Sequence, residues 1–233
     1  MTISNESRDR FKHAFEPIAL AMGRAGLTPD ALTLIGFAIT IVGAAILSQQ
    51  QWLVGGLVVL VGGVFDMFDG TLARATGKVS RLGAFMDSVF DRWGEALVYL
   101  GIVVGCSFAG FAEGAYFAAA AMGAAFMVSY TRAKAEGLGF TTGTGMAAIG
   151  IMPREVRLVV LSLGLILAPM PIYEALPPNE ACMGPCDFPQ GGSLSVALGI
   201  IIIGSTITTI QRIIHVRNQA RQQSSSQPTE NAS

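Results

Sequence analysis

Apolar residues fall in six long runs along the chain, separated by short polar segments. A helix needs about 20 predominantly apolar residues to cross the bilayer core, and only helices and closed barrels satisfy their backbone groups there. The pattern therefore predicts an all-α integral membrane protein with six transmembrane helices and both termini on one side. The predicted spans run from Ala31 to Leu47, Trp52 to Leu72, Leu82 to Cys106, Ala115 to Tyr130, Leu158 to Ile172 and Leu194 to Ile214.

The segment before the first span has a helical pattern of its own. Phe11, Phe15, Ile18 and Met22 recur at helical spacing, and basic residues accompany them. This predicts an N-terminal amphipathic juxtamembrane helix that lies on the inner leaflet. The segment has no continuous apolar stretch typical of a cleavable signal peptide.

Three segments follow from this pattern. We expect an interfacial helix over residues 1–25 and a six-helix domain over residues 26–217. Residues 218–233 are rich in Gln and Ser, which predicts a disordered tail.

Lys and Arg concentrate in alternate loops. The loops around 49–51, 107–114 and 169–193 contain none. Because cytoplasmic loops carry the excess of Lys and Arg, we expect a multi-pass protein of the cell membrane with cytoplasmic termini. The basic residues on the expected cytoplasmic side include Arg8, Arg10, Lys12, Arg24, Arg74, Lys78, Arg81, Arg132, Lys134, Arg154, Arg157, Arg212, Arg217 and Arg221.

Composition supports the membrane assignment. Only 13% of residues are charged and the mean hydropathy is +0.54, whereas soluble domains are about 25% charged. The net charge of -1 by itself gives no information about nucleic acid, and no nucleic-acid partner is expected for this membrane protein. Cys182 and Cys186 in the predicted outer loop form either a local disulfide or two unpaired thiols.

Four aspartates interrupt the second and third spans. Asp66 and Asp69 are i, i+3 neighbours, and Asp87 and Asp91 are i, i+4 neighbours, so each pair shares a helix face. Two facing pairs repel strongly unless a cation lies between them. Carboxylate oxygens suit Mg²⁺ or Mn²⁺. The sequence therefore predicts a divalent metal site at the cytoplasmic ends of these two helices.

Small residues and an arginine accompany the acids. Gly70, Ala73 and Gly83 remove side-chain bulk, so a helix or a phosphate can approach the backbone. The guanidinium of Arg74 can bind a phosphate in a bidentate fork. Together these features favour a diphosphate site. The alternative is an ion-paired bundle in which Arg74 and Arg92 only neutralise the acids.

The complete run D-x-x-D-G-x-x-A-R-x8-G-x-x-x-D-x-x-x-D resembles the signature of the CDP-alcohol phosphotransferases, and the chain is most like the bacterial phosphatidylinositol phosphate synthases. Members of the family displace CMP from a CDP-linked lipid or alcohol by attack of a second alcohol. The resemblance implies a homodimer and two Mg²⁺ or Mn²⁺ ions. It also implies that Asp66, Asp69, Asp87 and Asp91 ligate metal, that Asp91 is in addition the catalytic base, and that Gly70 and Arg74 contact the CDP moiety.

A segment before the first span extends the resemblance. Residues 26–30 read G-L-T-P-D, as in the same synthases, which implies nucleotide contacts from Thr28, Pro29, Asp30 and Ala31. Thr28 also suits a helix N-cap and Pro29 a first helical turn, and both roles can hold together. Ser80 aligns with a hydroxyl residue that touches the CDP-lipid in these enzymes.

Two further segments bear on the acceptor. Residues 129–136 and 153–158 resemble two segments of the phosphatidylinositol phosphate synthases, in which basic residues bind the phosphate of inositol phosphate. In the first segment Arg132 precedes Lys134, whereas the synthases have Lys before Arg. The positive charge is therefore kept at both positions, but the bidentate geometry of the guanidinium is not. The alternative is ordinary positive-inside bias. The residues carried over are Arg132, Lys134, Arg154 and Arg157.

The expected reaction is transfer of the phosphatidyl group from CDP-diacylglycerol to inositol phosphate, which gives phosphatidylinositol phosphate and CMP. The stretch from Asp87 to Arg92 lacks the D-P-x-A-D-K-like motif of phosphatidylglycerol phosphate synthases, which leans away from glycerol phosphate. Glycerol phosphate, serine, free inositol and an ether CDP-lipid stay open as alternatives. A cation carrier is a further alternative, although acids at only one end of two helices argue against a transport path.

Overall fold

The computed structural model describes residues 17–140, 149–168 and 192–226. This part of the chain is helical, with turns between the helices and no strand, so the predicted all-α class is confirmed there. A short helix covers residues 17–24. The longer helices are α2 (Pro29–Ser48), α3 (Trp52–Ala75), α4 (Arg81–Phe108), α5 (Ala112–Gly137), α6 (Arg154–Leu167) and α7 (Gly192–Ser226).

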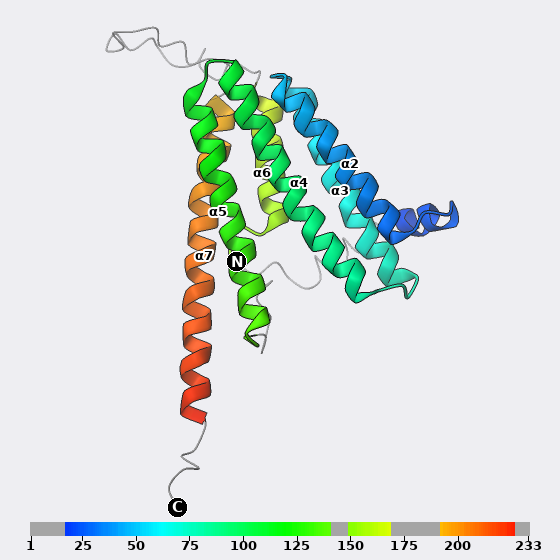
Figure 1. Cartoon of the computed structure of the whole chain (residues 1–233), viewed down its shortest axis with the longest axis vertical. Coiled ribbons are helices and arrows are strands. Elements are labelled where there is room, and N and C mark those ends of the chain that lie inside the picture. The colour runs from blue at the N-terminus through cyan, green and yellow to red at the C-terminus, as the bar shows by residue number, and fades with distance from the viewer. Residues whose placement is uncertain (1–16, 141–148, 169–191, 227–233) are drawn as a thin grey trace, which may run out of the picture.

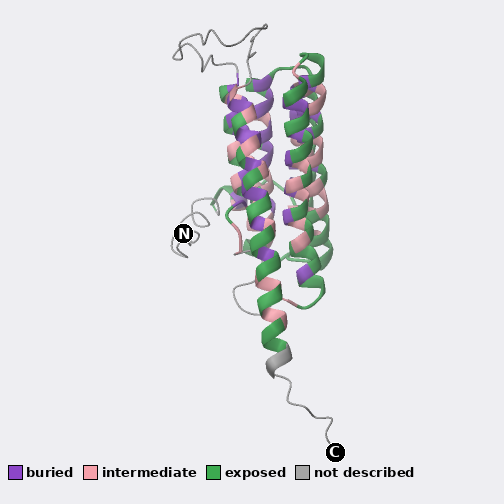
Figure 2. Ribbon diagram, turned by 90° about the vertical axis from the view of Figure 1, so that its left-hand side faces the viewer, coloured by how far each residue is buried: buried purple, intermediate pink, exposed green. Residues whose placement is uncertain are grey.

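The six long helices pack in a ring. Helix α2 packs against α3 and α4, α4 packs against α5, α5 packs against α7, and α6 closes the ring between α7 and α3 (Figure 1). Buried residues line the inward faces of these helices, and exposed residues follow the outward faces (Figure 2). Residues from α2, α3, α4 and α6 therefore meet inside one bundle.

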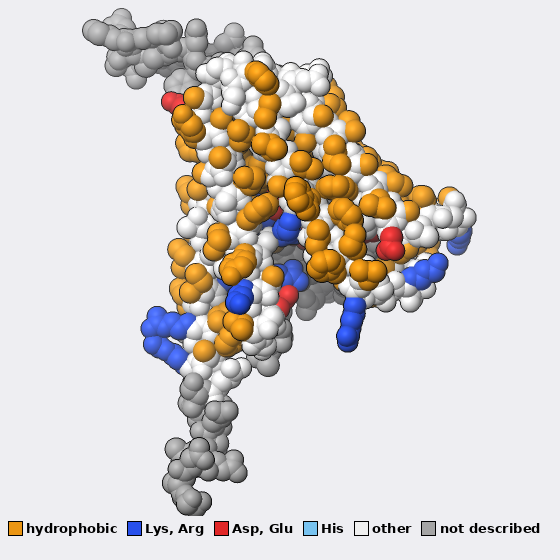
Figure 3. All heavy atoms as spheres, viewed as in Figure 1, with side chains coloured by type: hydrophobic (Ala, Val, Ile, Leu, Met, Phe, Trp, Pro, Cys, Tyr) orange, Lys and Arg blue, Asp and Glu red, His pale blue; other side chains and the backbone are white. Residues whose placement is uncertain are grey.

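The outer surface is that of a membrane protein. Four helices are long and apolar enough to cross a bilayer, namely α2, α3, α5 and residues 192–223 of α7. Large apolar side chains cover much of the face in Figure 3, whereas Lys and Arg gather toward its lower end. Helix α4 carries charged residues that lower its hydropathy. Helix α6 has 14 residues, about 21 Å of helix, which is less than the apolar core of about 30 Å.

The predicted disordered tail is helical in part, and two helices extend beyond the predicted spans. Helix α7 continues to Ser226, beyond the predicted end at Ile214, so residues 218–226 are helical where a disordered tail was predicted. The Gln and Arg residues of this stretch are good helix formers. Helix α6 begins at Arg154 rather than Leu158. The first sixteen residues, the end of the tail and Cys182 and Cys186 lie outside the described residues.

Helices α2 and α3 run antiparallel and nearly touch at two glycines. A Cβ added to Gly36 would lie 3.4 Å from both the carbonyl oxygen of Gly62 and the backbone nitrogen of Asp66. Side chains at this crossing would therefore hold the helices apart. The close approach brings the first residues of α2 level with the acidic end of α3.

Candidate metal centre and active site

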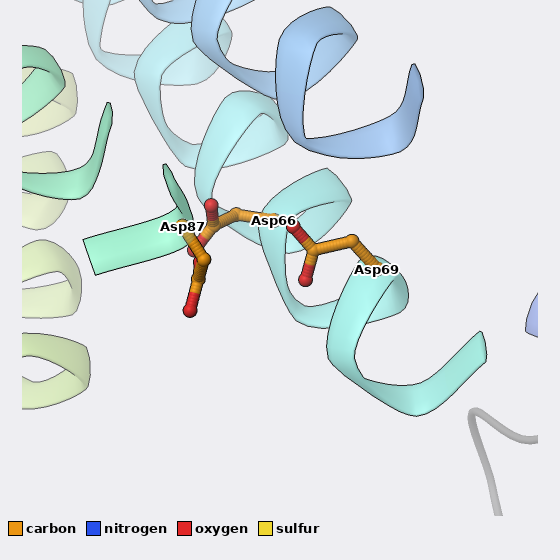
Figure 4. Close-up of side chains that lie close together, drawn as sticks. All are labelled: Asp66, Asp69 and Asp87. Atoms are coloured by element: carbon orange, nitrogen blue, oxygen red, sulfur yellow. The ribbon is translucent and has the colours of Figure 1, made fainter. Parts of the chain in front are cut away.

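Three carboxylates from two helices converge at one end of the bundle. Asp66 and Asp69 lie on α3 and Asp87 lies on α4, and each offers an oxygen within 4.8 Å of the other two (Figure 4). Asp69 is buried and the other two are partly buried. Oxygen ligands about 2.1 Å from Mg²⁺ in octahedral geometry lie about 3 to 4.2 Å apart. Small side-chain rotations would therefore fit these three acids to one divalent cation.

The Asp69 carboxylate is held on both oxygens. The hydroxyl of Thr33 on α2 donates to Oδ2 at 2.5 Å, and the backbone N–H of Gly70 donates to Oδ1. Both Thr33 and Asp69 are buried. The position of this acid is thus set by the neighbouring helix as well as by its own.

Asp91, which the sequence grouped with the other three acids, lies beside that cluster and is held by arginines. Nη1 of Arg154 lies 2.5 Å from Oδ2 of Asp66 and 2.7 Å from Oδ1 of Asp91. Nη2 of Arg92 lies 3.3 Å from Oδ2 of Asp91, and Arg92 also donates to the hydroxyl of Ser129 on α5. Because one Arg154 nitrogen contacts both acids, Asp66 and Asp91 are neighbours. Asp91 therefore stands next to the cluster but outside it.

A second acid–arginine pair lies one helical turn deeper. Nε and Nη2 of Arg157 donate to the two oxygens of Glu95 at 2.8 and 2.9 Å, and Nη1 donates to the Met152 carbonyl at 3.1 Å. The Arg157 side chain is only 2% exposed. Two ion pairs thus join helices α4 and α6, namely Asp91–Arg154 and Glu95–Arg157. This guanidinium is committed to a carboxylate, which differs from the phosphate-binding role predicted for it.

A cavity of about 50 Å³ extends from the acids into the bundle. A buried water needs about 10–15 Å³ and two to four polar partners, so the cavity has room for a few waters. The hydroxyl of Tyr99, which lines it, is buried and has no hydrogen-bond partner among the described residues. The polar side chains that line it include Thr40, Asp66, Asp91, Glu95, Arg154 and Arg157.

The segment ahead of α6 is anchored by α7. The hydroxyl of Thr208 accepts from the backbone N–H groups of Ile151 and Met152 at 3.1 and 3.0 Å. Buried Arg212 donates to the carbonyl of Ile149 at 3.1 Å and to that of Val128 on α5. These contacts fix the start of α6, from which Arg154 reaches the acids.

The predicted CDP-lipid contacts lie at neighbouring helix starts. The hydroxyl of Thr28 accepts from the Ala31 N–H at 3.2 Å, so the predicted N-cap of α2 is confirmed, and Ser80 caps α4 through the Gly83 N–H at 2.9 Å. An added Cβ at Gly83 would lie 3.6 Å from Oδ1 of Asp30, so the starts of α2 and α4 are adjacent. Pro29 occupies the first turn of α2, between Thr28 and Asp30.

The arginine of the motif lies beside its glycine. A Cβ added to Gly70 would lie 3.3 Å from Nη1 of Arg74, so the exposed guanidinium covers this small residue. A phosphate near the Gly70 backbone would therefore meet the Arg74 fork.

The predicted acceptor cations divide into two groups. Arg154 is part of the acidic centre and Arg157 is paired beneath it. Arg132 and Lys134 are exposed near the end of α5, and Nε of Arg132 lies 2.9 Å from Oε1 of Glu136. Only Arg154 of these four has a described ion pair with the motif aspartates.

Thr33, Glu95 and Arg212 were missed as parts of the site from the sequence. Glu95 follows Asp87 and Asp91 at a second four-residue interval, so the acidic face of α4 was a usable signal. Arg212 was counted only as a basic residue at a helix end. No signal in the sequence pairs Thr33 with Asp69, because their contact joins two separate helices.

Comparison with known proteins identifies the family of the chain. Residues 26–182 match the family described as CDP-alcohol phosphatidyltransferase. The archaetidylinositol phosphate synthase of Pyrococcus horikoshii is 37% identical over 154 residues, 66% of this chain and 77% of the relative. The phosphatidylinositol phosphate synthase of Streptomyces avermitilis is 30% identical over 235 residues, 99% of this chain and 89% of the relative.

Solved structures of the Mycobacterium tuberculosis phosphatidylinositol phosphate synthase are also similar. Its structure with bound CDP-DAG is 28% identical and has a TM-score of 0.69, over 87% of this chain and 92% of that chain. Its complex with manganese and citrate has the same identity and TM-score, over 87% of this chain and 88% of that chain. The chain therefore belongs to the CDP-alcohol phosphatidyltransferase family and is a transferase.

Proposed function

We propose that this membrane transferase moves the phosphatidyl group of CDP-diacylglycerol to inositol phosphate and releases CMP. The observation that carries the proposal is the convergence of Asp66, Asp69 and Asp87 at one end of the bundle, beside Gly70 and Arg74 of the family motif. The similar synthases from Streptomyces avermitilis and Mycobacterium tuberculosis support the choice of donor and acceptor.

The acids hold Mg²⁺ or Mn²⁺. One ion would lie among Asp66, Asp69 and Asp87, and Asp91 would complete a second set with Asp66 and Asp87, since Asp66 and Asp91 share the Arg154 nitrogen. Bound ions would neutralise the diphosphate and polarise the phosphorus that is attacked.

The residues of the chain position the reacting groups. Arg74 and the Gly70 backbone hold the diphosphate, while Thr28, Pro29, Asp30, Ala31 and Ser80 border the cytidine at the adjacent starts of α2 and α4. The acceptor hydroxyl attacks the lipid-linked phosphorus, and the bond from that phosphorus to the CMP oxygen breaks. The carboxylate of Asp91 takes the hydroxyl proton as general base.

The acceptor phosphate would be bound by the basic residues at the start of α6 and the end of α5. Arg154 already touches Asp66 and Asp91, so it is placed to join the acceptor to the acidic centre. Arg132 and Lys134 supply further positive charge, and Arg157 supports Arg154 from the turn below.

Arg154→Gln should raise the KM for inositol phosphate about tenfold or more, because a charge-assisted contact to phosphate is lost. The KM for CDP-diacylglycerol should change little, because Arg74 and the nucleotide segment remain. Steady-state kinetics with each substrate varied in turn measures both values. Equal increases in the KM for inositol phosphate and for CDP-diacylglycerol would contradict a separate acceptor site.

We propose that α4 and α6 cross the bilayer together with the other four long helices. Residues 26–217 form the transferase domain, residues 1–25 lie on the inner leaflet, and residues 218–233 are cytoplasmic. The termini and the active site then face the cytoplasm of a cell-membrane protein, as the distribution of Lys and Arg favours. We also propose a homodimer, on family resemblance alone.

An ether CDP-lipid is the second candidate donor, because the Pyrococcus horikoshii relative is an archaetidylinositol phosphate synthase at 37% identity. CMP release should be measured with CDP-diacylglycerol or CDP-archaeol, Mg²⁺, and each of inositol phosphate, glycerol phosphate, serine and inositol. We expect release with CDP-diacylglycerol and inositol phosphate. Release with only a different acceptor or donor would overturn that assignment, and no release with any pair would overturn the proposed reaction.

A further inference from the structure

Thr33 on α2 lies directly across from Asp69 on α3. The two helices run antiparallel and their backbones approach at Gly36, where an added Cβ would lie 3.4 Å from the Asp66 nitrogen. Three residues back along α2 is Thr33, and three residues forward along α3 is Asp69. The helix crossing therefore brings a hydroxyl to a carboxylate in a buried place.

The hydroxyl has one strong partner. Thr33 Oγ1 lies 2.5 Å from Asp69 Oδ2 and 3.2 Å from the Pro29 carbonyl one turn earlier. The residues are 7% and 5% exposed, so water competes little for this contact and the hydrogen bond is strengthened. The Gly70 N–H holds the other oxygen of Asp69. Both oxygens of the carboxylate are therefore held, and one of them lies within 4.8 Å of an oxygen of Asp66 and an oxygen of Asp87.

We propose that Thr33 is a positioning residue for the metal centre, which fixes Asp69 in the orientation that ligates the cation. The inference rests on the proposed metal-binding function of the three acids. Thr33 acts through Asp69 and touches neither substrate nor metal. It also lies in the second turn of α2, directly after the proposed cytidine contacts, so one helix positions both the nucleotide and a metal ligand.

Thr33→Val keeps the shape of the side chain and removes the hydroxyl, whereas Thr33→Ser keeps the hydroxyl. Loss of a partner that orients a metal ligand typically costs 10–100-fold in metal affinity. We expect Thr33→Val to weaken Mn²⁺ binding by about that factor and Thr33→Ser to bind nearly as tightly as the wild type. Mn²⁺ binding to the purified full chain in detergent, followed by electron paramagnetic resonance without lipid or acceptor, measures this directly.

The matched control is Thr206→Val. Thr206 also bonds the carbonyl four residues earlier, at 2.8 Å, but it is exposed on α7, so Mn²⁺ affinity should not change. Unchanged Mn²⁺ affinity in folded Thr33→Val would overturn the role proposed for Thr33. Saturable binding by the wild type in the same experiment would still support the proposed metal site. No saturable binding in the wild type would instead overturn the proposed function.

A double-variant cycle covers the case in which Thr33→Val folds poorly. Adding Thr33→Ala to Asp69→Asn should weaken residual Mn²⁺ binding no further than Asp69→Asn alone, because the Thr33 effect passes through the Asp69 carboxylate. Independent, multiplicative losses would contradict a positioning role.

Discussion

Asp91→Asn should lower the kcat for CMP release by about 10²–10⁴-fold, the usual contribution of a general base. The amide keeps the size of the side chain but cannot accept the proton of the acceptor hydroxyl. In the structure the carboxylate lies between Arg154 at 2.7 Å and Arg92 at 3.3 Å. These two contacts hold the carboxylate between α6 and the arginine that follows it on α4.

The variant removes the proposed base and one proposed ligand of the second ion together, but it leaves the first ion site intact. Asp66, Asp69 and Asp87 remain in the variant, so one Mn²⁺ ion should still bind. Glu113→Gln is the matched control, because Glu113 is an exposed acid in the first turn of α5, and its kcat should be unchanged. Turnover of Asp91→Asn near the wild-type value would remove Asp91 as the base.

Glu95→Gln should destabilise the folded chain by about 3–5 kcal/mol, because removal of one partner leaves a buried charge without compensation. Arg157, 2% exposed, donates to both oxygens of Glu95 and ties α6 to α4. Denaturant or thermal unfolding of the purified chain in detergent measures the change. The control is Glu136→Gln, which breaks the exposed pair with Arg132 and should cost no more than about 0.5 kcal/mol.

The double variant Glu95→Leu/Arg157→Met tests whether the pair is structural. Replacing a buried ion pair by apolar residues of similar volume is often neutral or stabilising, so much of the lost stability should return. A raised KM for inositol phosphate in this stable variant would show that Arg157 also serves the acceptor. If Glu95→Gln lowers the free energy of unfolding no more than Glu136→Gln does, the Glu95–Arg157 pair does not hold α4 and α6 together.

The sequence predicted the parts of the site that depend on spacing within one segment. Helical periodicity placed Asp66 with Asp69, and local cap chemistry placed Thr28 at the start of α2. The approach of α3 and α4 followed from the cost of leaving four acids without a cation between them. Three of the four acids do converge. Each pair lies on one helix face, and the last turns of α3 lie level with the first turns of α4.

The remaining contacts depend on how the helices are rotated and arranged around the ring. Arg154 and Asp66 are 88 residues apart, and no periodic pattern reports which helix faces which. The general excess of Lys and Arg on one side of a membrane also conceals the arginines that pair with acids, such as Arg154 and Arg157. For the same reason the commitment of Arg157 to Glu95 could only be found in the structure.

The most direct test of the central claim is Mn²⁺ binding to the purified chain in the presence of CDP-diacylglycerol, measured by electron paramagnetic resonance. We expect saturable binding that CDP-diacylglycerol strengthens. Asp87→Asn should abolish this binding or weaken it at least tenfold (about 1.4 kcal/mol), and Glu113→Gln should leave it unchanged. Binding by Asp87→Asn equal to that of the wild type, or no saturable binding by the wild type, would contradict a metal centre built from these aspartates.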